Sequence, residues 1–334
     1  MAPRSLAVIR GTPSEICRGL PDLRRSVDDM TLDEHTAPTA APPEPAAWLP
    51  IAAAGVTVVL WSSAFVAVRF VGEEISAGPL ALGRLLVGSL VLGVVLLPRP
   101  RLRPSGRDWI LLAVCGALWF GVYNVALNAA EQRIDAGTAA MLVNIGPLLI
   151  AVLAGFILSE GFPRQLIGGS LVAFTGVVVI GVATSSGEPE TVGVLLSVLA
   201  AAAYAVGVVA QKSLLGRLPA LQVTWIACTV GMLCCLPFTA DLIREAADAR
   251  TSTVLWLVYL GVFPTALAFT TWAYALNCTS AGRMANTTYL VPPLTILLGW
   301  VALGEAPVAL AYVGGALCLL GVWLSRRRRG SRAV

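Results

Sequence analysis

The chain of 334 residues offers few of the side chains that catalysis requires. Its single histidine, His35, lies in a proline-rich N-terminal segment, and neither an HExxH nor a GxSxG pattern occurs. None of the seven cysteines has CxxC spacing. Because an enzyme needs an activated nucleophile with a base, or a metal cluster, we expect no catalytic residue, no metal site, no cofactor and no enzymatic activity.

The side chains that could bind a solute are neutral amides and aromatic rings inside apolar stretches. Polar groups in such stretches are costly unless they face a cavity or a partner. Asn124 and Asn128, for example, are four residues apart and would share one helix face. We expect a substrate cavity to be lined by eight residues of this kind: Trp61, Asn124, Asn128, Asn144, Tyr204, Trp272, Asn286 and Tyr289.

These residue types suggest how a solute would be held. Asn124 and Asn286 are expected to fix its polar part, while Trp61, Tyr204 and Trp272 pack its apolar part. Neutral amides compensate a full charge poorly, so a zwitterion or an uncharged metabolite fits better than a strong ion. In the alternative interpretation, these groups only join helices by hydrogen bonds, as Asn, Ser and Thr commonly do in membranes.

One arginine lies well inside an apolar stretch. Arg84 is six residues into it, roughly 9 Å along a helix axis. Its side chain either reaches outward to Glu73, Glu74 or Glu131, or attracts an anionic group of the substrate. All nineteen acidic residues fall in the N-terminal segment, the loops or the helix ends, so no proton relay is expected at the centre of the protein.

Two glutamates occupy matching positions in short hinges. Glu160 stands just before Pro163, and Glu305 just before Pro307. A carboxylate beside a helix N-terminus meets unpaired amides and the positive end of the helix dipole. We therefore expect both glutamates to have a mainly structural role.

Prolines interrupt two of the apolar stretches. Pro147 and the pair Pro292 and Pro293 lack an amide hydrogen, and each leaves a carbonyl one turn earlier without its helical partner. A kink is expected at both places. We predict that these prolines act as hinges and shape the cavity more than they bind substrate through freed carbonyls.

The elements that must position these residues are membrane-spanning helices. The chain is 57% hydrophobic and 13% charged, with a mean hydropathy of +0.80, whereas soluble proteins are about 25% charged. Ten apolar runs each approach the roughly 20 residues that a spanning helix needs. A backbone in lipid must satisfy its own hydrogen bonds, so all ten should be helices. The runs cover about 48–70, 78–97, 109–130, 136–157, 164–183, 191–211, 221–238, 253–276, 281–303 and 307–324.

The second half of the chain repeats the first. A shift of 145 residues superimposes Pro147, Glu160 and Gly176 on Pro292, Glu305 and Gly321, and a shift of 143 lays Trp61 on Tyr204. Each copy, 48–183 and 191–324, holds five of the runs. An odd number of spans makes the second copy enter the membrane from the other side, so the sequence predicts an all-α membrane protein of two inverted five-helix repeats.

Positive charge predicts the orientation. With the N-terminus inside, thirteen arginines and lysines fall on the cytoplasmic side and three on the other, as the retention of positive charge in the cytoplasm requires. We expect a multi-pass protein of the cell membrane with both termini cytoplasmic. Residues 1–47 should form a disordered tail, and residues 325–334 a short basic tail.

The length, the repeat and the order of these features resemble the ten-helix EamA-type members of the drug/metabolite transporter superfamily. The matching residues are LWSSAFVAVRF from Leu60, Arg84 and the two hairpins with proline, glutamate and glycine. The resemblance implies a secondary transporter that exports a small amphipathic metabolite or amino-acid-like solute by alternating access. A flippase of a lipid-linked sugar and a membrane assembly protein are the alternatives, and no nucleic acid partner is expected.

Overall fold

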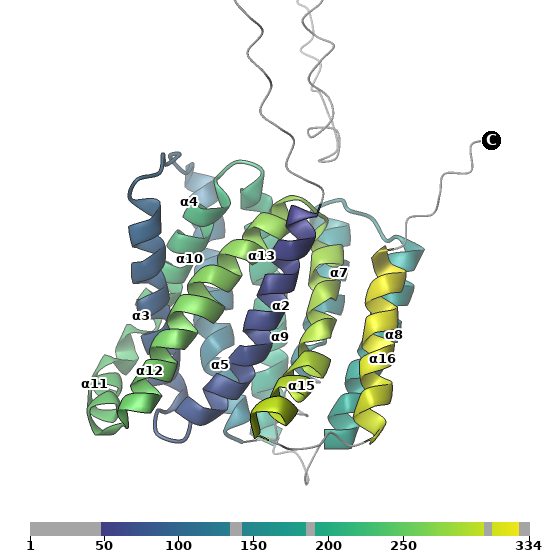
Figure 1. Cartoon of the computed structure of the whole chain (residues 1–334). Helices are drawn as coiled ribbons and strands as arrows, with labels where there is room; N and C mark the ends of the chain where they lie inside the picture. Colours follow the sequence, from purple (N-terminus) through teal and green to yellow (C-terminus); the bar gives the residue numbers. More distant parts are fainter. Residues whose placement is uncertain (1–47, 134–141, 185–190, 304–308, 327–334) are drawn as a thin grey trace, which may run out of the picture. The chain divides into compact units, whose positions relative to one another are not determined.

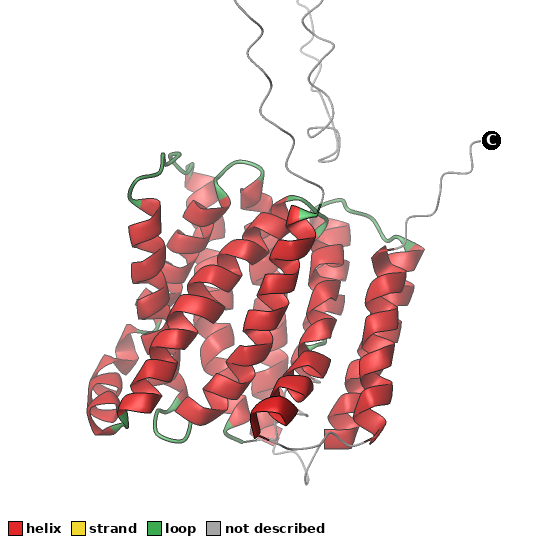
Figure 2. Ribbon diagram, viewed as in Figure 1, coloured by secondary structure: helices red, strands yellow, loops and turns green. Residues whose placement is uncertain are grey.

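The computed structural model describes residues 48–133, 142–184, 191–303 and 309–326. All regular elements within these ranges are helices (Figure 2). On length and composition, five of the described helices could each cross a membrane, and one bent pair could form a sixth span. The predicted class, an all-α integral membrane protein, is confirmed.

Helices of the first repeat correspond to the first five predicted runs. They are α2 (Leu49–Val71), α3 (Ala77–Leu96), α4 (Gly106–Val114) continued by η1 (Cys115–Val122) and α5 (Tyr123–Glu131), α7 (Gly146–Ile157), and α8 (Arg164–Thr184).

The second repeat supplies the other five. They are α9 (Thr191–Leu215), α10 (Ala220–Cys234) with η2 (Leu236–Phe238) and α11 (Thr239–Asp248), α12 (Thr251–Leu260) continued by η3 (Gly261–Leu267) and α13 (Ala268–Asn277), α14 (Ala281–Ala285) continued by η4 (Asn286–Leu290) and α15 (Val291–Leu303), and α16 (Ala309–Arg326).

The two ends of this bundle differ in what they carry. The start of α2 and the end of α16 lie at one end, which we call the tail end, and α11 lies at the opposite end (Figure 1). Because an even number of spans leads from the start of α2 to the end of α16, both must lie at the same end of the bundle. The loops near 99–103 and 217 bring their arginines to the tail end as well.

Helices α8 and α16 pack against each other through glycines related by the 145-residue shift. A Cβ on Gly176 would lie 2.5 Å from the carbonyl oxygen of Gly314, and a Cβ on Gly169 would lie 2.6 Å from that of Gly321. The shift pairs Gly169 with Gly314 and Gly176 with Gly321, so each glycine meets the counterpart of the other. Two equivalent, antiparallel helices can make such reciprocal contacts when a pseudo-two-fold axis passes between them.

A second reciprocal contact joins the repeats elsewhere. A Cβ on Gly116 would lie 2.6 Å from the carbonyl oxygen of Ala227, and one on Gly261 would lie 2.9 Å from that of Arg84. Gly261 is the counterpart of Gly116 by the 145-residue shift, and Ala227 is the counterpart of Arg84 by the 143-residue shift. Small residues let these helices approach closely where lipid provides no hydrophobic force between them.

The third and eighth predicted runs both contain a π-helix, which the sequence analysis did not foresee. They are η1 at Cys115–Val122 and η3 at Gly261–Leu267, and the 145-residue shift superimposes them. In η3, Pro264 lacks the amide that an α-helix would use. Such π segments occur frequently at functional sites.

The run at 221–238 also ends differently from the prediction, which placed no helix after it. Helix α11 follows at a bend of 54°. Its Glu245 carboxylate accepts hydrogen bonds from the Ser76 backbone amide at 2.8 Å and from the Ser76 hydroxyl at 2.9 Å, and Arg250, just beyond α11, forms an ion pair with Glu74. These contacts tie α11 to the loop between α2 and α3.

Candidate functional site

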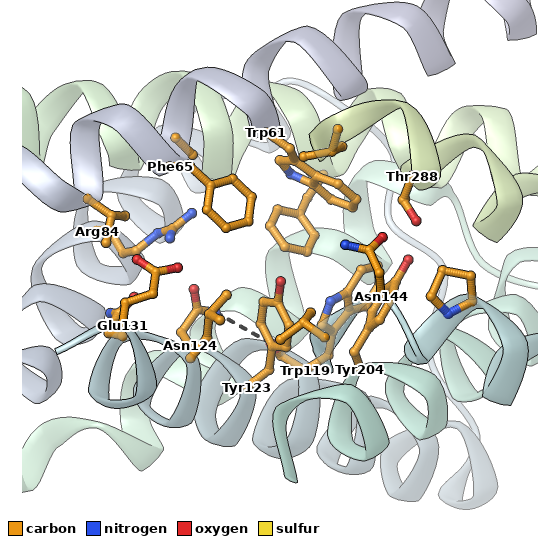
Figure 3. Close-up of a pocket in the computed structure, with 18 residues that line it drawn as sticks. Trp61, Phe65, Arg84, Trp119, Tyr123, Asn124, Glu131, Asn144, Tyr204 and Thr288 are labelled. Atoms are coloured by element: carbon orange, nitrogen blue, oxygen red, sulfur yellow. Dashed lines mark hydrogen bonds between the residues drawn. The ribbon is translucent and has the colours of Figure 1, made fainter. Parts of the chain in front are cut away.

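A cavity of about 90 Å³ lies between the two repeats. Five of the eight residues predicted to bind substrate line it: Trp61, Asn124, Asn128, Asn144 and Tyr204. Arg84 and Pro147 line it as well. Figure 3 shows these side chains converging from helices far apart in the sequence.

Aromatic rings form one wall of the cavity. The Trp119 ring lies 6.3 Å from that of Trp61, 5.4 Å from Tyr204 and 5.0 Å from Phe269, measured between centroids. The Trp61 and Trp119 planes are at 81°, an edge-to-face arrangement that aromatic pairs prefer. This wall can pack an apolar side chain of a solute. Trp119 and Phe269 were not among the predicted residues, although both lie in apolar runs.

Trp61 is held in place by the irregular turn of η3. Its indole Nε1 donates a hydrogen bond to the Pro264 carbonyl oxygen at 3.2 Å. Trp272 stacks behind it, with ring centroids 5.0 Å apart, and donates its own Nε1 to Gln211 Oε1 at 3.1 Å. Trp272 is fully buried and does not line the cavity. In this structure Trp272 supports Trp61, and its contact with a substrate stays a prediction.

Asn124 and Asn128 are positioned by backbone carbonyls. The Asn124 side-chain amide donates to the Phe120 carbonyl oxygen at 2.8 Å, inside η1, and that of Asn128 donates to the Ala77 carbonyl oxygen at 3.2 Å, at the start of α3. Asn128 therefore joins two helices, as in the alternative interpretation, whereas Asn124 bonds within its own helix, and both side chains also line the cavity. The side-chain oxygens remain available to accept hydrogen bonds from a solute.

Asn286 and Tyr289 do not line the cavity. Asn286 Oδ1 accepts a hydrogen bond from the Ser170 hydroxyl at 2.7 Å, and Tyr289 packs with Ala173 and Cys318. Both residues are fully buried and directed toward α8 and α16. The 3₁₀ geometry of η4 turns them there, and Thr288 between them faces the cavity instead. In this structure Asn286 faces α8, and its expected contact with a substrate stays a prediction.

Arg84 and Glu131 bring charge to one end of the cavity (Figure 3). Arg84 is only 7% exposed, and its Nε donates to the Thr265 hydroxyl at 3.2 Å. It does not reach outward to Glu73 or Glu74. Glu131, the last residue of α5, is half-buried. The sequence analysis treated Glu131 as a helix-end residue, but its spacing of three and seven residues from Asn128 and Asn124 places it on their face.

The predicted hinge prolines stand at the start of helices. Helix α7 begins at Gly146, directly before Pro147, after a turn at Asn144. Pro292 and Pro293 occupy the first turn of α15, after η4. A proline costs little in the first turn because the amide that it lacks has no helical partner there. Both runs are therefore interrupted beside the cavity instead of kinked within a continuous helix.

Glu160 connects the two repeats at the tail end. Its carboxylate accepts hydrogen bonds from the backbone amides of Ala281 at 2.7 Å and Gly282 at 3.3 Å. These amides open α14, so Glu160 caps a helix of the other repeat and not the helix that follows it in sequence. Nearby, Lys212 Nζ donates to the carbonyl oxygens of Leu276 and Thr279, both at 2.7 Å. Glu305 lies outside the described residues.

Comparisons with known proteins agree with this architecture. The model of the EamA-like transporter family matches twice, at residues 48–182 and 191–327. A relative from Streptantibioticus cattleyicolor, named a probable terminal-alkyne amino-acid exporter, is 38% identical over 82% of this chain and 92% of its own length. A probable amino-acid metabolite efflux pump of Salmonella typhimurium is 26% identical over 69% and 82%. A protein of known crystal structure superposes with a TM-score of 0.66 over 83% of this chain and 96% of its own, at 21% identity, which concerns the fold alone.

Proposed function

The chain belongs to the EamA-like transporter family, and we propose that it is a secondary transporter that exports a small, amphipathic, amino-acid-like solute by alternating access. The observation that carries this proposal is the cavity between the repeats. It combines an aromatic wall, which includes Trp61 and Trp119, with amide and charged groups at the other side. Such a mixture suits a solute with one apolar and one polar part.

The arrangement of the repeats supports alternating access. Inverted repeats around a central site allow one half to move against the other, so that the site opens to each side in turn. Glu160 makes contacts at the tail end that a movement of this kind would change, because it joins the first repeat to α14 of the second. Interrupted helices beside Pro147 and Pro292 offer places for bending.

The names of two relatives support the class of solute. One is named for amino acids with a terminal alkyne and the other for amino-acid metabolites. An exporter in the cell membrane with cytoplasmic termini agrees with the arginines at the tail end, such as Arg99, Arg101 and Arg103. We also infer that the protein catalyses no covalent chemistry, since its family and the names of its relatives indicate transport.

Transport can be tested with purified protein in liposomes. Vesicles are loaded with unlabelled leucine, phenylalanine or a terminal-alkyne amino acid, and entry of the same labelled compound by exchange is measured. We expect exchange at least several times that of protein-free vesicles. Ala64→Phe, which fills the cavity, should abolish it, whereas Leu90→Phe on the exposed face of α3 should not.

Two results would contradict the proposal. The first is exchange that persists unchanged in Ala64→Phe at equal protein levels, because the cavity would then not be the transport site. The second is movement of a lipid-linked sugar across the bilayer in the absence of amino-acid exchange, which would establish the flippase alternative.

A further inference from the structure

Arg84 is a buried charge with little compensation. Among the described residues, the Thr265 hydroxyl is the hydrogen-bond acceptor of its guanidinium, and it binds Nε alone. The two Nη groups, which form the outer fork, have no acceptor in the described part of the chain. Burying a guanidinium in this state costs free energy, and this cost falls when an anion binds its two Nη groups.

Glu131 faces the same end of the cavity without closing that fork. The two side chains lie next to each other at one end of the cavity in Figure 3, yet within the described ranges no carboxylate oxygen comes within 4.0 Å of an Arg84 nitrogen. An internal salt bridge would have neutralised both groups. The two charged groups therefore stand at the same end of the cavity without a salt bridge, each open to a ligand of opposite charge.

The pseudo-two-fold relation shows that packing does not require these charges. The 143-residue shift makes Ala227 the counterpart of Arg84 in the second repeat, and the 145-residue shift makes Leu276 the counterpart of Glu131. The backbones at Arg84 and Ala227 make the same close approach to Gly261 and Gly116. An apolar residue therefore fills each equivalent place, and both charges lie on the first repeat alone.

We propose that Arg84 and Glu131 form a subsite for an α-amino-carboxylate, in which Arg84 binds the carboxylate and Glu131 binds the ammonium group. This assignment rests on the proposed function and names the part of the substrate that the cavity recognises. The planar guanidinium can hold a carboxylate through two parallel hydrogen bonds. The Asn128 side-chain oxygen lies on the same helix face as Glu131 and can accept a further ammonium hydrogen.

The rest of the cavity determines where the side chain of such a substrate lies. Trp61, Trp119 and Tyr204 stand toward the end opposite Arg84 (Figure 3). A zwitterion bound between the two charges would extend its side chain along this aromatic wall. The subsite then selects the head group, and the wall selects an apolar side chain.

The subsite predicts that both charges of the substrate are required. We therefore measure how well three compounds compete with labelled amino acid in the exchange assay: the parent amino acid, its carboxamide and its N-acetyl derivative. With wild-type protein we expect each derivative to compete at least tenfold more weakly than the parent, because one buried charge of the protein stays unpaired.

Variants assign each preference to one side chain. Arg84→Gln should lose the discrimination against the carboxamide and keep that against the N-acetyl compound, and Glu131→Gln should do the reverse. Arg133→Gln and Glu73→Gln change exposed charges near the same end and should keep the wild-type pattern. Arg84→Lys keeps the charge without the planar fork and should retain part of the carboxamide discrimination.

The outcomes separate this inference from the proposed function. If wild-type protein exchanges no amino acid, the proposed function fails and the subsite with it. If it exchanges amino acids and both derivatives compete as well as the parent, the subsite alone is refuted, whatever the stability of the variants. If the variants bind all three compounds more weakly by one common factor, Arg84 and Glu131 have a structural role and the inference is wrong.

Discussion

Replacing Gly176 by alanine would place a methyl group where α16 already packs. The new Cβ would lie 2.5 Å from the Gly314 carbonyl oxygen and 2.7 Å from the Cys318 nitrogen, so the two helix backbones would have to separate. Overpacking of this kind costs about 1 to 3 kcal/mol. In the same helix, a Cβ on Gly168 would meet nothing within 4 Å, and alanine there should gain about 0.5 to 1 kcal/mol from helix propensity. The expected difference in stability is about 2 to 4 kcal/mol.

The measurement is the temperature at which half of the detergent-solubilised protein is lost from the monodisperse peak after heating. We expect Gly176→Ala to melt at least about 4 °C below Gly168→Ala, since 1 kcal/mol corresponds to about 2 to 4 °C in domains of 150 to 250 residues. Gly314→Ala, which places a methyl group on the other side of the same contact, 2.6 Å from the Gly176 carbonyl oxygen, should behave like Gly176→Ala. Equal melting temperatures for Gly176→Ala and Gly168→Ala would refute the close contact between α8 and α16, and with it the pseudo-two-fold axis that the contact defines.

Three further predictions follow from contacts at other places. Glu160→Gln should lower thermal stability by about 1 to 2 kcal/mol, because charged hydrogen bonds to the α14 amides are weakened, and substrate preference should stay unchanged; a variant of normal stability with altered preference would contradict this. Asn286→Ala should lower stability through loss of the Ser170 hydrogen bond and leave the apparent affinity in the exchange assay within twofold of wild type. A large loss of affinity at normal stability would show that Asn286 contacts the substrate. Reporter fusions after Pro104 and Ser186 should be cytoplasmic and non-cytoplasmic respectively, and the opposite result would invert the orientation.

The helical plan could be predicted because lipid imposes simple conditions on sequence. A spanning helix must be apolar over about 20 residues, and the 145-residue repeat then relates the two halves. Helix α11 escaped prediction since its Asp241, Arg244 and Glu245 resemble a polar loop. Its place depends on the contacts of Glu245 and Arg250 with the loop after α2, which sequence periodicity does not contain.

Residues that line the cavity could be predicted from the sequence where regular helix geometry holds. Asn124 and Asn128 line the cavity because spacing of four residues maintains one face along α5. Asn286 lies away from the cavity because η4 winds as a 3₁₀-helix and directs residue 286 toward α8, whereas the repeat predicts the same facing in both halves. Glu131 could have been recognised from its spacing to Asn128, but a position at a helix end was taken to mean contact with water.

The paired π-helices make the site depend on residue count as well as residue type. Each α-helical residue turns the chain by about 100°, and an i→i+5 turn encloses one residue more than an α-turn. The π turn takes up this extra residue, so removing one residue from Cys115–Val122 would restore a regular helix and leave Asn124, Asn128 and Glu131 facing the cavity. Inserting one residue there would instead rotate all three by about 100° away from it. The same holds for Gly261–Leu267 and the Pro264 carbonyl that orients Trp61. Single-residue insertions in these two short segments should therefore reduce transport more than single-residue deletions, even though hydropathy and length remain those of a membrane span.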